Sequence, residues 1–172
     1  IISKRIFVER MLVRKNEEMR DVTNKTQVVK QTEVKDDLPM PWIVVDECHE
    51  FLPESGETPA SKALMTILRE GRQPGVSLIM ATQQPAKIHM DAITQSDIVM
   101  SHRLTASFDL EALDRIFLSY ENKGSKALFN SMPRTKGCAI IMDDKNERLH
   151  TMQVKPRITW HGGEDPNAIT EI

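Results

Sequence analysis

The chain has 172 residues, which is enough for one domain with a buried core. Hydrophobic residues make up 40% and charged residues 28%, and no stretch approaches the roughly 20 apolar residues of a membrane span. The net charge of −2 excludes a globally basic nucleic-acid-binding protein, so such contacts need a local patch or an oligomer. Cys48 and Cys138 are interpreted as reduced thiols. Since the start of the chain has no signal-peptide layout, we expect a cytoplasmic protein with no membrane partner.

The first 37 residues are predicted to form an N-terminal helix and a polar loop. Residues 1–20 have a helical composition with a partial apolar side, whereas residues 16–37 are almost wholly polar. We therefore expect a solvated helix that continues into a mobile loop. Residues 38–41 favour an extended approach to the next element, because their two prolines disfavour helix.

Residues 43–45 read Ile-Val-Val and predict a short strand buried on both faces, as in a parallel sheet. Asp46 and Glu47 follow directly, and two acids at the tip of a buried strand are costly unless they are used. Their usual use is nucleotide hydrolysis. The first acid holds Mg²⁺, directly or through water, and the second polarises the attacking water, which is the Walker B pattern. The alternative is a strand that ends in an ordinary polar turn.

Helices and strands alternate along the following residues. Thr58 and Pro59 predict the start of an amphipathic helix, which ends within residues 69–75, where two glycines and a proline stop it. The further elements are predicted at residues 76–81, 97–100, 137–142 and 148–154 for strands, and at 90–95, 107–116 and 123–131 for helices. This alternation predicts an α/β fold with a mostly parallel sheet over residues 38–155, followed by an irregular tail at 156–172.

Polar groups stand at the ends of three of these strands, at Asp46-Glu47, Thr82-Gln83 and His102-Arg103. If the strands are neighbours, these groups converge on one edge of the sheet, where open parallel sheets bind ligands. Gln83 can hydrogen-bond a phosphate or a water and so report whether the γ-phosphate is present. The alternative for Gln83 is a simple turn residue.

Arg69 and Arg72 flank Gly71 just before a predicted strand. The planar guanidinium binds pairs of phosphate oxygens and stays charged, so an arginine here can reach the nucleotide of a neighbouring subunit. The alternative is that both are solvated cations at a helix end, where the helix dipole favours them.

Three stretches in this order resemble the HerA–FtsK clade of P-loop motor ATPases, most closely the archaeal HerA-type DNA helicases and translocases. They are residues 43–53 (IVVDECHEFLP), 69–79 (REGRQPGVSLI) and 81–85 (ATQQP). Residues 91–98, 103–105 and 154–163 add to the resemblance, which covers roughly residues 38–164. The first stretch is generic to P-loop proteins, whereas the second and third are much more specific.

The resemblance implies a three-layer, RecA-like core and a set of site residues. The implied roles are a Mg²⁺-side acid acting through water (Asp46), a catalytic base (Glu47), a sensor (Gln83), an arginine finger or sensor at the subunit boundary (Arg72), and further nucleotide contacts (Arg69 and, less securely, Arg103). It also implies ATP and Mg²⁺ as cofactors, and a hexameric ring that threads double-stranded DNA. A nuclease partner in DNA end resection and repair is implied as well.

The family's phosphate loop, Gly-x-x-x-x-Gly-Lys-Ser/Thr, is absent from the 172 residues. That loop supplies the backbone N–H groups and the lysine that hold the β- and γ-phosphates. We therefore interpret the chain as the C-terminal part of a larger ATPase, with ATP hydrolysed at subunit interfaces. The chain alone is expected to show weak or no hydrolysis.

Two other functions stay open. Residues 46–49 read Asp-Glu-Cys-His, a literal D-E-x-H box that resembles superfamily 2 helicases, and residues 80–82 partly mimic their Ser-Ala-Thr motif. The Gln-Gln-Pro sequence at residues 83–85 fits HerA better. The second alternative is a non-catalytic oligomerisation scaffold, which the missing phosphate loop favours.

Other polar residues carry weaker signals. The five histidines are scattered, so no zinc site is expected, and Cys48 and His49 are expected to pack or hydrogen-bond beside the acidic pair. Lys123, Lys126, Arg134 and Lys136 form a basic cluster. It is either a solvated face or a DNA-phosphate contact facing a channel.

Overall fold

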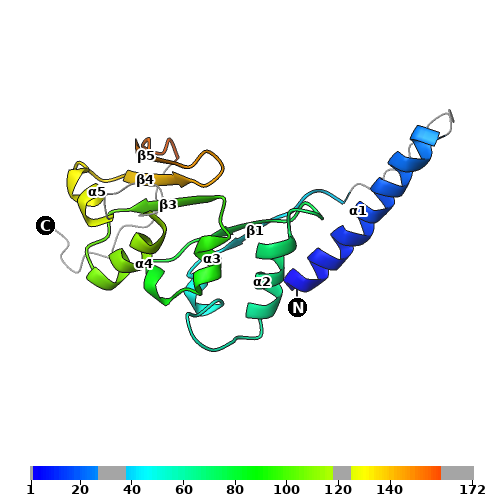
Figure 1. The fold of residues 1–172 in the computed structure, drawn as a ribbon, viewed down its shortest axis with the longest axis horizontal. Coiled ribbons are helices and arrows are strands. Elements are labelled where there is room, and N and C mark those ends of the chain that lie inside the picture. Colours follow the sequence, from blue (N-terminus) through cyan, green and yellow to red (C-terminus); the bar gives the residue numbers. More distant parts are fainter. Residues whose placement is uncertain (1, 27–37, 118–124, 160–172) are drawn as a thin grey trace, which may run out of the picture.

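The computed structural model of the protein describes residues 2–26, 38–117 and 125–159 (Figure 1). The described strands form two sheets. Strands β1 (Trp42–Val45) and β2 (Ser77–Met80) make a parallel pair, and β3 (Ile98–His102), β4 (Cys138–Asp143) and β5 (Arg148–Gln153) make an antiparallel sheet in the order β3-β4-β5. The predicted alternation of helices and strands is therefore present, and so is the final hairpin.

The parallel pair is covered on one face only. Helices α2 (Ser61–Glu70) and α3 (Met90–Thr94) lie on the same side of β1 in Figure 1. The opposite face exposes Trp42 at 68%, Val44 at 67% and Ile79 at 44%, and we call these three residues the bare face. The sequence predicted a strand buried on both faces. This is wrong for the described residues, because none of their helices covers the second side of β1.

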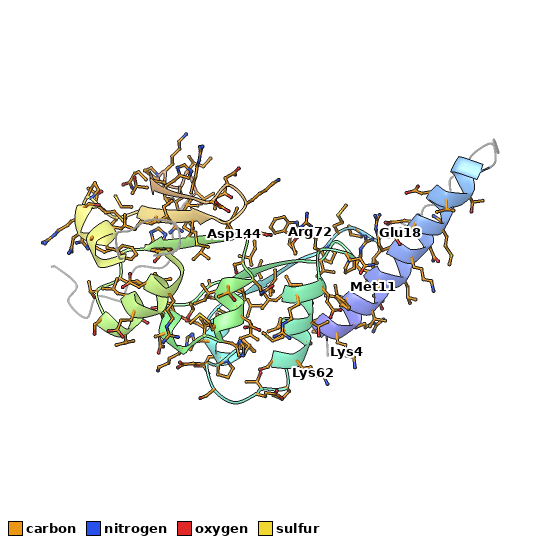
Figure 2. All side chains as sticks on the ribbon, viewed as in Figure 1. Lys4, Met11, Glu18, Lys62, Arg72 and Asp144 are labelled. Atoms are coloured by element: carbon orange, nitrogen blue, oxygen red, sulfur yellow. The ribbon has the colours of Figure 1, made fainter. Side chains whose placement is uncertain are left out.

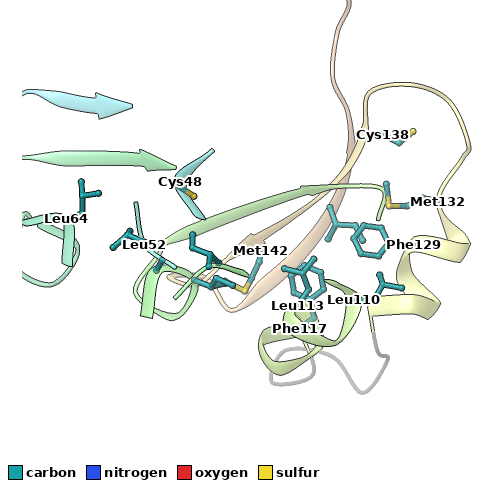
Figure 3. Packing of buried hydrophobic residues seen from close by; sticks show 14 residues of the cluster. Cys48, Leu52, Leu64, Leu110, Leu113, Phe117, Phe129, Met132, Cys138 and Met142 are labelled. Carbon is teal, nitrogen blue, oxygen red and sulfur yellow. The ribbon is translucent and has the colours of Figure 1, made fainter. Parts of the chain in front are cut away.

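The central strand of the antiparallel sheet is more completely buried, whereas its edge strand β3 exposes Ile98 at 64% and Met100 at 53%. In β4, Cys138, Ala139, Ile140 and Met142 are all buried, so both faces of this central strand are covered. Helices α4 (Ser107–Phe117) and α5 (Ser125–Ser131) supply Phe117 and the other large side chains that pack there (Figure 3). The same hydrophobic cluster runs on to Cys48, Leu52 and Leu64 beneath the parallel pair.

Helix α1 (Ile2–Thr26) projects away from the two sheets (Figure 1). It continues six residues past the predicted helix at 1–20, into the polar stretch, and residues 27–37 lie outside the described residues. Arg10 anchors it, since this side chain is buried and donates to Pro74 O at 2.9 Å and Leu38 O at 2.6 Å. A buried guanidinium needs such partners, and these two carbonyls tie α1 to the segments that enter β2 and β1. No helix among the described residues is both long and apolar enough to cross a membrane.

The turn between α2 and β2 explains the glycine at its start. A Cβ at Gly71 would collide with Ile67 O and lie 2.6 Å from Val76 O, so only glycine fits between these two carbonyls. The other end of α2 differs from prediction, because the helix begins at Ser61 rather than Pro59. The Thr58 hydroxyl still accepts from Ser61 N at 3.2 Å, so it caps the entry to the helix.

The condition that the three strands with polar ends are neighbours holds for β1 and β2 but not for β3. Strand β3 pairs antiparallel with β4, with Val99 opposite Met142, and the described strands include no ladder between β3 and β2. Two short 3₁₀ helices, η1 (Cys48–Glu50) and η2 (Pro85–Lys87), follow β1 and β2. The short segments between each strand and its 3₁₀ helix carry the candidate site residues at 46–47 and 82–84.

Candidate functional site

The loops after β1 and β2 meet at the carboxyl end of the parallel pair. The ladder extends beyond both strands, because Ala81 N donates to Val45 O and Cys48 N donates to Ala81 O, each at 2.9 Å. Residues 46–49 and 82–84 therefore lie beside each other, as the ends of neighbouring parallel strands should.

Glu47 is held in an unusual conformation at this edge. Its φ of 45° and ψ of 48° are left-handed, which costs a residue with a side chain about 1–2 kcal/mol. One carboxylate oxygen, Oε1, accepts a 2.6 Å hydrogen bond from Gln83 Nε2. The other, Oε2, is buried and has no hydrogen-bond partner among the described residues. A strained carboxylate with one free acceptor can act as a general base toward a water.

Asp46 lies beside this carboxylate and is exposed. Its Oδ1 accepts from Glu47 N at 2.9 Å, which orients the side chain. Within residues 2–26, 38–117 and 125–159, no group of three or more metal-ligating side chains occurs. Mg²⁺ is commonly held by one or two carboxylates together with substrate phosphates and water, so the exposed Asp46 carboxylate suits that ion and no all-protein cage is needed.

His49 joins the two loops from inside. Its side chain is only 8% exposed. Its Nδ1 lies 2.9 Å from Thr82 Oγ1, and its Nε2 lies 3.3 Å from Glu50 Oε1. Cys48 beside it is also buried, and burial raises the pKa of this thiol to about 11, with the Glu47 and Asp46 charges acting in the same direction. The prediction that Cys48 and His49 pack or hydrogen-bond beside the acidic pair is confirmed.

The two arginines around Gly71 differ in their partners. Arg69 forms an ion pair with Asp91 of α3, and this hydrogen bond lowers the pKa of the Asp91 carboxyl below its ordinary value. Arg72 is exposed in the turn beyond the carboxyl end of α2 (Figure 2). This turn precedes β2, so Arg72 lies at the amino end of the parallel pair, opposite the end that carries Glu47.

Arg103 and the basic cluster lie away from this edge. Arg103 follows β3 in the antiparallel sheet, and its buried Nη1 has no hydrogen-bond partner among the described residues. Arg134 and Lys136 are exposed, whereas Lys123 and the side chain of Lys126 are not among the parts of the chain that the structure describes. The structure thus brings two of the three predicted strand ends together and places the third in the other sheet.

Sequence reasoning missed one polar link. Asp109 lies in the first turn of α4, and its buried carboxylate accepts from Ala86 N in η2 at 3.1 Å. It thereby connects α4 to the loop that follows Gln83. The signal in the sequence, an acid in the first turn of a helix, is the same for a cap and for this contact.

Comparison with solved structures identifies the fold. The genome packaging NTPase B204 of Sulfolobus turreted icosahedral virus 2, in complex with AMPPCP, matches with a TM-score of 0.56 at 16% sequence identity. The match covers 69% of this chain and 54% of that one. The fold is the RecA-like P-loop NTPase core, as predicted.

Two curated relatives are similar in sequence. The chain is 25% identical over 156 residues to the probable DNA double-strand break repair helicase HerA of Methanocaldococcus jannaschii. It is 31% identical over 101 residues to the DNA double-strand break repair helicase HerA of Pyrococcus furiosus. These matches cover 91% and 58% of this chain, but it spans only 30% and 18% of the two relatives.

Fold and sequence together define the class, a HerA-like P-loop ATPase core, and the predicted resemblance is confirmed at that level. More particularly, the family described as "Zonular occludens toxin (Zot)" has a sequence model that matches residues 3–149. The chain belongs to this family.

Proposed function

We propose that the chain forms the hydrolytic part of an ATP-driven DNA translocase or helicase of the HerA type. The observation that carries the proposal is the pairing of Glu47 with Gln83 at the carboxyl end of two parallel strands. A base and an amide joined at 2.6 Å can hold one water between a carboxylate and a phosphate.

Each residue at this edge then has a role. Bound Mg²⁺ would neutralise charge on the β- and γ-phosphates, and Asp46 would hold it, directly or through water. Glu47, whose side chain is 40% exposed, accepts a proton from the attacking water. Gln83 orients the Glu47 carboxylate and contacts the γ-phosphate or the water. Arg69 and Arg103 remain proposed nucleotide contacts, and no hydrogen bond between described residues joins either one to Glu47.

The phosphate loop has to come from outside the 172 residues, because the sequence contains none. The bare face supports this proposal. Three large apolar side chains on one sheet face are costly in water, at about 25 cal/mol per Å² of apolar area, and a third layer of protein would cover them. The free edge of β2 leaves room for a further strand, since β1 is its only partner among the described strands.

Arg72 is proposed to act on the nucleotide of a neighbouring subunit. Within one chain it lies at the opposite end of β2 from Glu47, so it does not reach its own site without a large movement. Its exposure at a surface turn (Figure 2) suits an arginine that is inserted across a subunit interface. This placement supports hydrolysis at interfaces within a ring, for which we propose a homohexamer.

Double-stranded DNA as the translocated partner, a nuclease partner and a role in DNA repair are proposed because both curated relatives are described as DNA double-strand break repair helicases. A cytoplasmic location is proposed with them. The exposed Arg134 and Lys136 offer a place for phosphate contact.

The test is replacement of Glu47 by Gln in the full-length protein. We expect ATP turnover to fall about 10²–10⁴-fold while binding of Mg²⁺–ATP persists, because the amide keeps the shape but not the basicity. Glu54→Gln is the matched control, since Glu54 is an exposed acid of the same loop. Normal hydrolysis by Glu47→Gln would refute the base assignment. A wild-type protein that neither binds nor hydrolyses ATP would favour the oligomerisation scaffold.

A further inference from the structure

His49 is the buried group that ties the two site loops together. Its ring contacts Thr82 across the gap between the β1 and β2 loops, at 2.9 Å, and Gln84 Nε2 lies 3.4 Å from its Nε2. Thr82 precedes Gln83 directly, and Gln83 donates to Glu47. A closed ring of covalent bonds and hydrogen bonds therefore runs from Glu47 through His49, Thr82 and Gln83 back to Glu47.

The two ring nitrogens of His49 have partners in both loops. Thr82 Oγ1 accepts from Gln84 N at 3.0 Å and keeps a second lone pair and its own hydrogen, so it can hydrogen-bond His49 Nδ1 in either tautomer. Gln84 Nε2 adds a second link from the ring to the β2 loop. Glu50 Oε1 lies 3.3 Å from Nε2, and Glu47 Oε2 lies 3.6 Å from Nδ1.

The backbone at Glu47 makes this contact possible. Its left-handed conformation reverses the chain directly after Asp46 and starts η1, in which His49 is buried. The conformational strain is offset if the loop is locked, and the His49–Thr82 bond locks it to the β2 loop together with the Glu47–Gln83 bond.

We propose that His49 is a positioning residue of the ATPase centre, which acts through Thr82 to hold Gln83 against Glu47. This inference rests on the proposed function. Loss of the His49–Thr82 bond frees the Thr82–Gln83 segment to move relative to Glu47. A displacement of about 1 Å at a reacting group costs up to about 10²-fold in rate, without loss of substrate binding.

The test uses the full-length protein with His49→Leu, His49→Asn, Thr82→Val and the double variant His49→Leu/Thr82→Val. His49→Leu is expected to lower kcat about 10–100-fold, with KM and the affinity for Mg²⁺–ATPγS changed less than about twofold. His49→Asn is expected to recover most of kcat, because the Asn carbonyl oxygen can accept from Thr82 in place of Nδ1. His150→Leu is the control, since His150 is an exposed histidine on β5.

The double variant separates positioning from general loss of structure. If His49 acts through Thr82, the double variant is no slower than the slower single variant, because both changes remove the same bond. Multiplied losses in kcat would refute the inference, and so would wild-type kcat in His49→Leu. A parallel fall of kcat, nucleotide affinity and Tm in both His49 variants would assign His49 a structural role only and would also refute it. A wild-type protein without ATPase activity would refute the proposed function itself, and this inference with it.

Discussion

The central strand β4 of the antiparallel sheet and the strand β1 of the parallel pair differ in how far they are buried. In the antiparallel sheet, the central strand β4 has Ile140 and Met142 almost fully buried, with Phe117 of α4 and Phe129 of α5 in the same cluster (Figure 3). In the parallel pair, every second residue of β1 is exposed, and the bare face has no covering helix among the described residues. The better packed sheet therefore lies away from the candidate chemistry.

The difference shows where further protein is needed. A strand covered on both faces, like β4, is a stable support, whereas a strand pair with an exposed apolar face and an unpaired edge is suited to receive another segment. The candidate site lies on the open sheet and is held by hydrogen bonds between loops, and the hydrophobic cluster reaches it at Cys48. We expect the two regions to respond differently to mutation.

The largest effect is expected from Arg72→Ala, which tests whether the parallel pair depends on a neighbouring subunit. Turnover by the full-length protein should fall about 10³–10⁵-fold with ATP binding retained. Mixing Arg72→Ala subunits with Glu47→Gln subunits should restore part of the activity. At some interfaces, an intact Glu47 from the first variant then meets an intact Arg72 from the second. Failure to complement in mixed rings would place Arg72 in its own subunit's site or in none.

Shortening one side chain in each sheet to alanine tests the packing comparison directly. Ile140→Ala should cost about 2–5 kcal/mol, because Ile140 is 1% exposed and its removal leaves a cavity. Val44→Ala should stay within about 0.5 kcal/mol in the 172-residue chain, because Val44 is already in water. Urea unfolding of both variants measures the difference. If further protein covers the bare face in the full-length protein, Val44→Ala should lower the free energy of unfolding more there than in the 172-residue chain. Equal losses for Ile140→Ala and Val44→Ala in the 172-residue chain would contradict the comparison.

Asp109 connects the two regions and should give an intermediate effect. Asp109→Ala leaves Ala86 N without its acceptor and should cost about 1–3 kcal/mol in urea unfolding. Asp109→Asn keeps an acceptor oxygen and should cost less. Glu111→Ala, an exposed acid of the same helix, is the matched control and should have little effect. An Asp109→Ala cost no larger than the Glu111→Ala cost would mean that this link contributes nothing to stability.

The smallest effect concerns Cys48, where the hydrophobic cluster reaches the site. Burial raises the pKa of its thiol from 9.0 to about 11. Alkylation at pH 8 should therefore be about 100-fold slower than for the unfolded chain, as mass spectrometry with and without urea can measure. The folded state holds this proton more tightly, so the associated stability is present below pH 9 and is lost as pH rises toward 11. Equal alkylation rates in the two states would show that the loop opens freely.

The nearness of Glu47 and Gln83 was predicted on the condition that their two strands are neighbours. A β-branched run before Asp46 and an apolar run before Thr82 predicted two strands, and parallel neighbours necessarily place their carboxyl ends at the same edge. The placement of Arg103 was not predictable in this way. Strand β3 pairs with β4, which lies about 40 residues later in the chain, and no local sequence pattern encodes that pairing.

The sequence by itself determined the order of the elements, the acids at the first strand tip and the absence of a phosphate loop, because these depend on residue type and spacing. Only the tertiary structure decided which groups touch. The left-handed turn at Glu47, the His49–Thr82 bond, the Asp109 contact and the bare face all depend on distances between segments far apart in the chain. Such contacts are set by how whole elements pack, and no single stretch of sequence contains that information.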